Sequence, residues 1–342
     1  MGEAHEAESN YTDTHRCGHG NKAGMGLFRA ATLQMESRPG DKAANLARID
    51  HFAGEAARAG ARLMLAPECS VTGYWWLRNL PHEEFAALAE PGPDGHTAQA
   101  LLAMARKHGI SIGAGFIERA ADGRLFKPYL VAMPDGRYAV HRKLHAFVHP
   151  SLTCGDSYTV FELPEGVKAG ILICYDCNLV ENVRITALMG AQVLLAPHQT
   201  GGCRGKNPHQ MGVIDAALWH NRHRDPEAIE REILGEKGRG WLMRWLPSRA
   251  HDNGIFLIFS NGIGVDDDEI RTGNAMILDP YGRILAESRK ADEDLVVADL
   301  DLALLKEATG RRWIRSRRPE LYGKLCERTG EERPTRELKF EE

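Results

Sequence analysis

A short apolar run, a cysteine and a helical pattern follow one another closely in the middle of the chain. Residues 169–173 have the length and composition of a buried strand. The apolar residues of 179–188 recur at helical spacing, with Asn178 as the predicted N-cap and Gly190 as the glycine that closes the helix. Cys174 therefore stands where a strand gives way to a helix, which is where α/β folds expose functional groups.

Three interpretations of Cys174 remain open at this point. A thiol beside a helix N-terminus has its thiolate favoured, so Cys174 is a candidate nucleophile. Cys174 and Cys177 also form a C-x-x-C pair of the kind found in thiol–disulfide oxidoreductases. The third interpretation is a buried cysteine that packs as a small hydrophobic residue.

Composition excludes several classes of protein. The 342 residues are 43% hydrophobic and 26% charged, with a net charge of −4, so nothing indicates a nucleic-acid or anionic-membrane partner. No apolar run approaches the roughly 20 residues of a membrane-spanning helix. Seven irregularly spaced cysteines do not form a disulfide framework and fit a reducing compartment. We expect a cytoplasmic protein.

The N-terminal residues 1–26 are polar and lack the apolar core of a signal peptide, which predicts a disordered tail. His15, Cys17 and His19 alternate within this tail as metal ligands sometimes do. No second pair of ligands follows at zinc-finger spacing, so a flexible leader is the stronger interpretation.

Alternating strand and helix patterns follow the tail. A strand at 27–35, a helix at 41–59 and a strand at 62–66 predict a βαβ unit or a close relative. Pro67 ends the second strand, so Glu68 stands at its carboxyl end. A surface glutamate is the alternative interpretation.

Later segments continue the alternation of predicted strands and helices. A hairpin is predicted from strands at 125–133 and 137–144 joined by Pro-Asp-Gly, and it carries Lys143, although a strand lysine usually points to water. The other predicted elements are a helix at 94–108, strands at 110–118, 192–196, 255–260, 274–278, 283–287 and 295–300, and helices near 210–221 and 226–237. We expect one domain at 27–300 with an insertion at about 201–247, and a C-terminal extension at 301–342 that contacts another subunit.

Three motifs occur in a specific order: Glu68 in Leu-Ala-Pro-Glu, Lys143 in His-Arg-Lys-Leu-His, and Cys174 in Ile-Cys-Tyr-Asp. In this order the chain resembles the nitrilase superfamily of carbon–nitrogen hydrolases over roughly residues 27–290. Because Tyr-Asp follows the cysteine, it is most similar to the amidase and carbamoylase branch. Flanking residues agree with the resemblance, namely Asp176, Glu181, Arg184, Arg249 and Asn253.

The resemblance implies a fold and a site. The fold would be an α-β-β-α sandwich that pairs across subunits into a homodimer or larger homo-oligomer of four layers. Cys174 would be the nucleophile, Glu68 the general base and Lys143 the electrostatic group, with the Tyr175 backbone N–H also binding the oxyanion. Asp176, Glu181 and Arg184 would surround that machinery. The resemblance implies no metal and no cofactor.

The chain also departs from the family pattern. Many members carry a second glutamate soon after the lysine, but residues 146–155 contain no acid, and His149 is a candidate to take part of that role. Val180 replaces the usual proline. The candidate substrate-pocket residues are Tyr74, Trp75, His149, His198 and Gln199. The aromatic pair at 74–75 could equally pack beneath a loop.

The function that follows is hydrolysis of a small amide or N-carbamoyl compound to a carboxylic acid and ammonia or an amine, through a thioester on Cys174. A nitrilase is the nearest alternative. A thiol–disulfide oxidoreductase using Cys174 and Cys177, and a catalytically silent scaffold, are alternatives of different classes.

Overall fold

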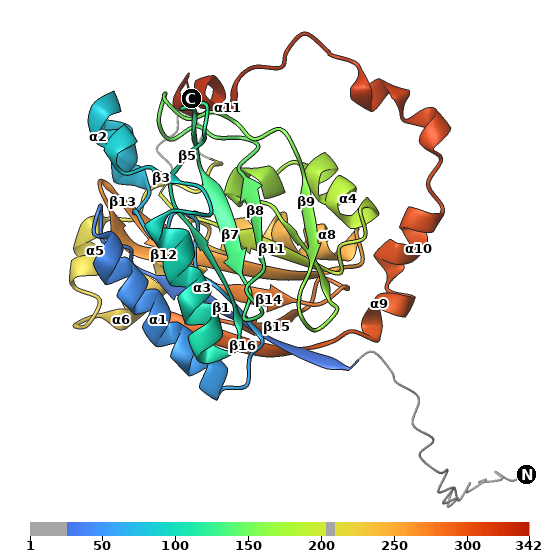
Figure 1. Cartoon of the computed structure of the whole chain (residues 1–342), viewed down its shortest axis with the longest axis horizontal. Coiled ribbons are helices and arrows are strands. Elements are labelled where there is room, and N and C mark those ends of the chain that lie inside the picture. Colours follow the sequence, from blue (N-terminus) through green and yellow to red (C-terminus); the bar gives the residue numbers. More distant parts are fainter. Residues whose placement is uncertain (1–25, 203–208, 342) are drawn as a thin grey trace, which may run out of the picture.

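The computed structural model describes residues 26–202 and 209–341 (Figure 1). The predicted tail, with His15, Cys17 and His19, lies outside the described residues except for its last member. Residues 203–208 of the predicted insertion lie outside them as well.

The strands form two halves of one continuous sheet. The first half contains β8 (Tyr138–Arg142), β7 (Pro128–Ala132), β4 (Ser111–Gly115), β2 (Leu63–Leu65), β1 (Leu27–Met35) and β16 (Asp294–Asp301). The second contains β12 (Phe256–Asp266), β11 (Val193–Pro197), β10 (Lys168–Ile171), β9 (Thr159–Glu162), β13 (Glu269–Thr272), β14 (Met276–Leu278) and β15 (Ile284–Glu287). Among the described residues, the strand pairing that joins the halves is that of β1 with β12, at Gln34 with Asn261 and Met35 with Gly262.

Helices cover the outer faces of both half-sheets, and others lie at the edges of the sandwich. They are α1 (Lys42–Arg58), α2 (His82–Ala87), α3 (His96–His108), α4 (Val180–Leu188), α5 (Ala216–His220), α6 (Pro226–Leu234), α7 (Arg239–Met243), α8 (Leu246–His251), α9 (Leu304–Glu307), α10 (Thr309–Arg315) and α11 (Thr335–Glu341). Shorter 3-10 turns are η1 (Trp75–Asn79), η2 (Cys174–Cys177), η3 (Pro319–Leu321) and η4 (Gly323–Cys326). A small separate sheet contains β3 (Glu90–Pro91), β5 (Glu118–Arg119) and β6 (Leu125–Phe126).

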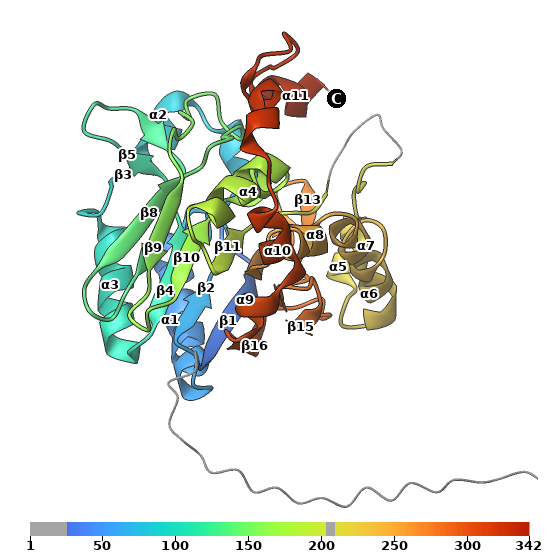
Figure 2. The same ribbon diagram turned by 90° about the vertical axis from the view of Figure 1, so that its right-hand side faces the viewer.

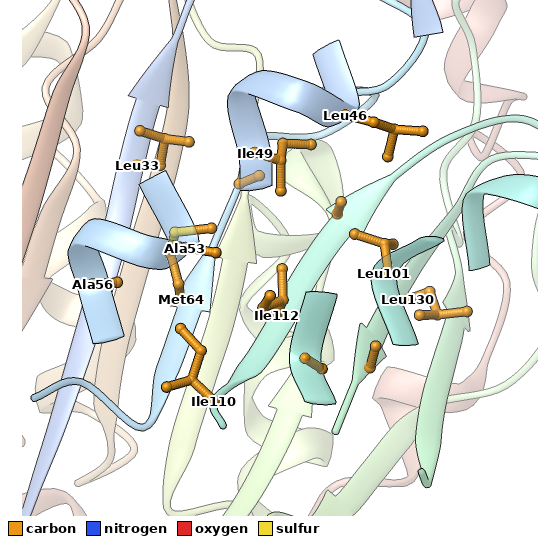
Figure 3. Close-up of a cluster of buried hydrophobic side chains, with 14 of the residues drawn as sticks. Leu33, Leu46, Ile49, Ala53, Ala56, Met64, Leu101, Ile110, Ile112 and Leu130 are labelled. Atoms are coloured by element: carbon orange, nitrogen blue, oxygen red, sulfur yellow. The ribbon is translucent and has the colours of Figure 1, made fainter. Parts of the chain in front are cut away.

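Three hydrophobic clusters define the layers. The first lies between helices α1 and α3 and the first half-sheet, with Ile49, Leu101 and Ile112 among its members (Figure 3). The second lies between the two half-sheets, where Leu65 and Ile171 are buried together. The third lies between the second half-sheet and helices α4 and α8. The order helix, sheet, sheet, helix confirms the predicted α-β-β-α sandwich.

Local signals placed several elements correctly. The β1 strand has the predicted bounds, and Asp41 caps α1 by accepting a hydrogen bond from the Ala44 amide at 3.0 Å. The predicted hairpin is β7–β8, paired from Pro128–Arg142 to Ala132–Tyr138. In these segments the hydrophobic period agrees with the tertiary packing.

The prediction of Asn178 as an N-cap was wrong. Residues 174–177 form the turn η2, and Leu179 precedes α4 without a side-chain cap. The reason is the Asp176 carboxylate, whose Oδ2 accepts a hydrogen bond from the Ile173 amide at 3.2 Å and tightens the chain just after the strand. Arg249 then binds the Asn178 carbonyl oxygen at 2.7 Å.

The predicted helix at 210–221 was too long. Only α5 is helical there, because Gly212 has a φ of +73° and the Asp215 carboxylate caps the first turn. Strands β9 and β13 were not predicted. Both are short, and their pairing partners are what stabilise them.

The C-terminal segment leaves β16 and packs along one side of the sandwich, with Leu302 and Leu305 in the cluster between the half-sheets and Ile314 against the cluster beneath α4 and α8. It runs through α9 and α10, along the side that carries α4 and α8, to α11 (Figure 2). At its end the Arg336 guanidinium donates to the Phe147 carbonyl oxygen at 2.8 Å. Within residues 26–202 and 209–341, no helix is both long and apolar enough to cross a membrane.

Candidate active site

The carboxyl ends of β2, β10 and β11 and the end of β8 meet at one edge of the sandwich. Glu68 follows β2, Lys143 follows β8 and Cys174 follows β10. The Lys143 Nζ lies 2.6 Å from the Glu68 Oε1, and both side chains are at most 1% exposed. Two residues that are distant in sequence thus form a buried ion pair.

The turn that carries Glu68 packs closely against β4. A Cβ atom on Gly115 would lie 2.5 Å from the Cys69 backbone nitrogen, so only glycine allows this approach. Cys69 has a φ of +49°, which is strained for a residue with a side chain. The Tyr129 hydroxyl donates to the Ala66 carbonyl oxygen at 2.7 Å and holds the same segment from β7.

Cys174 is the first residue of η2 and is partly buried. Its φ of +52° places it in the left-handed region, at a cost of about 1–2 kcal/mol that the surrounding structure must offset. Such strain occurs at sharp strand-to-helix turns that expose a nucleophile. Cys174 lines a cavity of about 330 Å³.

Aromatic side chains dominate the cavity wall. The lining residues are Tyr74, Trp75, Phe147, Cys174, Tyr175, Asn178, Gln199, Thr200, Gly201, Gly202, Gln210, Met211, Trp241, Trp245, Glu269 and Arg271. The predicted pocket residues Tyr74, Trp75 and Gln199 are therefore at the cavity. The Gln199 Nε2 also donates to the Glu68 carbonyl oxygen at 2.8 Å, which ties the wall to the ion pair.

Two predicted pocket residues lie outside this lining. His149 stacks on Phe85 with ring centroids 3.9 Å apart, and its Nε2 lies 3.0 Å from the Leu80 carbonyl oxygen. His198 is buried against Phe259, and its Nδ1 lies 3.0 Å from the Thr200 Oγ1. Both histidines pack behind the wall.

Asp176 connects the elements of the site. Its Oδ1 accepts a hydrogen bond from the His145 amide at 2.9 Å, and its Oδ2 accepts from the amides of Leu144 and Ile173, both at 3.2 Å. A carboxylate that accepts several backbone hydrogen bonds is a strong anchor. Asp176 therefore holds the strand end bearing Lys143 against the turn bearing Cys174.

Glu181 and Arg184 lie on α4, away from the cavity. They line a separate groove of about 720 Å³ between α4, α8 and the C-terminal segment. The Arg184 Nη2 donates to the Asp252 carbonyl oxygen at 3.0 Å. Neither residue lines the cavity that Cys174 lines.

Electrostatics at the ion pair favour its charged form. Burial alone raises the pKa of the Glu68 carboxyl, but the charges of Lys127 and Lys143 outweigh burial and hold that pKa at about 2. Burial lowers the pKa of Lys143, whereas the charges of Cys174 and Glu68 raise it above its ordinary value. Glu68 and Lys143 are therefore both charged at neutral pH.

The two cysteines of the C-x-x-C pair have different surroundings. Burial and the Glu68 charge raise the pKa of the Cys174 thiol, and Lys143 opposes them. Cys177 is fully buried in the cluster beneath α4, where its Sγ lies 3.4 Å from the Leu172 carbonyl oxygen. Both thiols are free. The packing of Cys177 favours a structural role over a redox partnership.

Several residues of the site were not predicted from the sequence. Lys127 is 1% exposed, and its Nζ lies 2.7 Å from the Glu68 Oε1. The sequence pattern that could have indicated a buried Lys127 is a lysine within an apolar run, directly before a proline. Arg271 is also buried in the cavity wall, where it pairs with Glu269 at 2.6 Å and Asp266 at 3.0 Å. No local sequence signal predicted the ion pair of Arg271 with Glu269, because strand β13, which carries both residues, was not predicted.

Comparisons with known proteins agree with this architecture. The Carbon-nitrogen hydrolase family model matches residues 29–309. The "Hydrolase in pqqF 5'region" of Pseudomonas protegens is 31% identical over 312 residues, covering 90% of this chain and 94% of that protein. An (R)-stereoselective amidase of Pseudomonas sp. is 30% identical over 301 residues, covering 86% of this chain and 93% of the relative.

A solved structure shows the same fold. An amidase of the nitrilase superfamily from Nesterenkonia AN1 superposes with a TM-score of 0.63 at 24% identity, covering 87% of this chain and 97% of that one. The chain belongs to the carbon–nitrogen hydrolase family, and its similarity to the amidase-like branch of the nitrilase superfamily is confirmed. The family match spans most of the described sandwich.

Proposed function

We propose that this protein is a thiol amidohydrolase that cleaves a small amide through a thioester on Cys174. The observation that carries the proposal is the buried Glu68–Lys143 ion pair beside a partly buried cysteine on a strained turn. An amidase requires a nucleophile, a proton acceptor and a cation for the oxyanion, and these residues supply all three.

The first half-reaction forms the thioester. The Cys174 sulfur attacks the amide carbonyl carbon, and its proton passes to Glu68. The Glu68 Oε2 suits this role because it has no hydrogen-bond partner among the described residues, whereas Oε1 faces Lys143. Lys143 and the Tyr175 backbone N–H stabilise the oxyanion. The oxyanion collapses, the C–N bond breaks, and the nitrogen leaves as ammonia or an amine with the proton from Glu68.

The second half-reaction consumes water. Glu68 takes a proton from a water molecule, whose oxygen attacks the thioester carbon. The C–S bond then breaks to release the carboxylic acid, and Cys174 recovers a proton. A related structure supports a nucleophilic cysteine, since a glutamate-to-glutamine mutant of the Nesterenkonia amidase carries the acetamide moiety of fluoroacetamide on its active-site cysteine.

The cavity wall supports an acyl group with a flat apolar body. Trp241, Trp245 and Phe147 line the cavity, and aromatic side chains gain most from burying such a group. We therefore propose arylalkyl amides as preferred substrates. N-carbamoyl compounds and nitriles are the alternatives, and the relatives include both an amidase and a nitrilase.

The test combines ammonia release with intact mass. Wild type, Glu68→Gln and Cys174→Ala are incubated with phenylacetamide, propionamide, N-carbamoylphenylalanine and phenylacetonitrile, with the surface variant Glu83→Gln as control. We expect ammonia from wild type with phenylacetamide, and an acyl mass that builds up slowly on Cys174 in Glu68→Gln, because loss of the base slows acylation and leaves the thioester without a base to activate water. Cys174→Ala should give neither, and Glu83→Gln should match wild type.

Other outcomes would contradict the proposal in distinct ways. Ammonia from the nitrile alone would indicate a nitrilase. A loss of two mass units mapped to Cys174 and Cys177 would indicate a thiol–disulfide oxidoreductase. No ammonia, no adduct and no reaction of Cys174 with iodoacetamide would indicate a silent scaffold.

We also propose that the protein assembles into a homo-oligomer through α4 and the C-terminal segment. Exposed apolar side chains gather there, namely Val180, Ile185, Leu188, Met189, Trp313, Leu321 and Leu325. Exposed apolar patches of this kind mark interaction surfaces. Sedimentation equilibrium tests this, and a monomer at micromolar concentration would contradict it.

A further inference from the structure

Lys127 lies directly opposite Lys143 in the structure. The β7–β8 pairing begins at Pro128 with Arg142, so the next pair outward is Lys127 with Lys143. The Lys143 amide donates to the Lys127 carbonyl oxygen at 3.0 Å, which confirms this register. Residues paired across a hairpin point to the same face, so both lysines approach the site from one side.

Both ammonium groups approach one oxygen. The Lys127 Nζ is 2.7 Å and the Lys143 Nζ 2.6 Å from the Glu68 Oε1. All three side chains are at most 1% exposed, so water screens their charges little. Like charges directly opposite one another destabilise a hairpin, and burial increases that cost. Such an arrangement requires compensating negative charge.

Glu68 supplies only part of that compensation. The Lys127 Nζ has no well-aligned hydrogen-bond acceptor within the described part of the chain, so its side chain acts on Glu68 through the ion pair. Its Nζ also lies 4.5 Å from the Tyr74 ring centroid and 5.7 Å from that of Phe147. Both rings line the cavity, and their faces attract a cation without neutralising it. Within this cluster one carboxylate and two ammonium groups leave an excess charge of +1. The buried Asp176 carboxylate also acts on Lys143, but its oxygens accept hydrogen bonds from three backbone amides.

A negative charge on Cys174 would balance this excess. Both lysines favour the thiolate of Cys174, whereas Glu68 and burial oppose it. With Lys143 alone, the ion pair would be neutral and would offer the thiolate little net attraction.

We propose that Lys127 is a positioning residue of the site, holding Glu68 ionised together with Lys143 and supplying the net positive charge that stabilises the Cys174 thiolate. The inference rests on the proposed role of Cys174 as nucleophile. In this proposal Lys127 balances the charge of the site, whereas Lys143 contacts the reacting oxyanion. A purely structural role for Lys127 would affect folding alone.

The test measures thiol reactivity directly, without turnover. Alkylation of Cys174 by iodoacetamide is followed by mass spectrometry from pH 6 to pH 10 in wild type, Lys127→Met and Lys127→Arg. Lys127→Met leaves the Glu68–Lys143 pair balanced, so the fold is expected to persist. Lys107→Met, a change at an exposed lysine, is the matched control.

We expect Lys127→Met to move the midpoint of alkylation upward by about one pH unit, which is roughly tenfold slower reaction at pH 7. Lys127→Arg should restore most of the wild-type rate because it restores the charge. An unchanged pH profile in folded Lys127→Met would overturn the inference.

Two further outcomes are also decisive. If neither Lys127→Met nor the smaller Lys127→Gln gives the wild-type circular dichroism spectrum, the cation serves the fold and the inference is overturned. If the alkylation profile shifts as expected but wild type hydrolyses no amide, the proposed function fails while the charge balance stands.

Discussion

The backbone amide of His145 donates a hydrogen bond to the Asp176 Oδ1 at 2.9 Å. Together with the hydrogen bond from the Leu144 amide to the Oδ2 atom, this contact joins the strand end that carries Lys143 to the turn that carries Cys174. Asp176 is fully buried, and it accepts two further backbone amides with its other oxygen. The relative position of the cation and the nucleophile therefore depends on a carboxylate that does not line the cavity.

Asp176→Asn should lower both stability and activity. The amide keeps one acceptor oxygen but replaces the other with a donor that faces backbone N–H groups. We expect a loss of about 2 kcal/mol in the free energy of unfolding and at least a tenfold loss in kcat/KM. Urea denaturation and steady-state kinetics measure these, with Asp135→Asn as an exposed control. Wild-type kcat/KM in Asp176→Asn would contradict the positioning role.

Gly115→Ala should displace the turn that carries Glu68. The added methyl group would lie 2.5 Å from the Cys69 nitrogen, so the backbone must move. We expect a destabilisation of about 1–3 kcal/mol and a fall in kcat that exceeds any change in KM. Gly323→Ala adds a methyl group in open space and serves as the control. Equal kcat values in the two variants would disprove the close-approach argument.

Trp241→Ala should change substrate preference more than catalysis. The indole lines the cavity on α7, distant in sequence from Glu68, Lys143 and Cys174. We expect KM for phenylacetamide to rise about tenfold, which corresponds to about 1.4 kcal/mol of lost contact, with kcat for propionamide close to wild type. A matching loss for both amides would mean that the aromatic wall does not select the acyl group.

Acid should destabilise the protein partly through His198. Burial lowers the pKa of His198 to about 3, so the folded protein keeps it neutral while the unfolded chain takes up a proton below its ordinary pKa of 6.5. Stability from this residue is thus complete above pH 6.5 and declines as the pH falls toward 3. Between pH 7.5 and 5.0, wild type should lose about 2 kcal/mol more than His198→Gln. Urea denaturation at both pH values measures these losses. Equal losses of unfolding free energy in wild type and His198→Gln would contradict the role of His198.

Cys177→Ala should leave the chemistry of Cys174 unchanged. Cys177 packs beneath α4 with its thiol directed at a carbonyl oxygen, so its removal creates a small cavity. We expect a destabilisation of about 1 kcal/mol and an unaltered rate of Cys174 alkylation. A large change in that rate would revive the redox interpretation of the C-x-x-C pair.

The α-β-β-α sandwich that the resemblance implied was confirmed, and several of its elements follow from local patterns. Residues 27–35 and 41–59 show the periods of a strand and a helix, and Asp41 caps the helix as its type suggests. Strand β13 was missed because its stability comes from pairing with β12. The charged pair of Glu269 and Arg271 in the cavity wall was missed with it.

The sequence by itself carried the motifs of Glu68, Lys143 and Cys174, because these motifs are short, local and fixed in order. Their resemblance to the nitrilase superfamily implied the sandwich and the three residues proposed for catalysis. Only the tertiary structure decided which other side chains reach them. It brought Lys127 to Glu68 and placed Glu181 and Arg184 in another groove. The physical reason is that hairpin register and sheet-to-sheet packing, which no local period encodes, determine which buried charges meet.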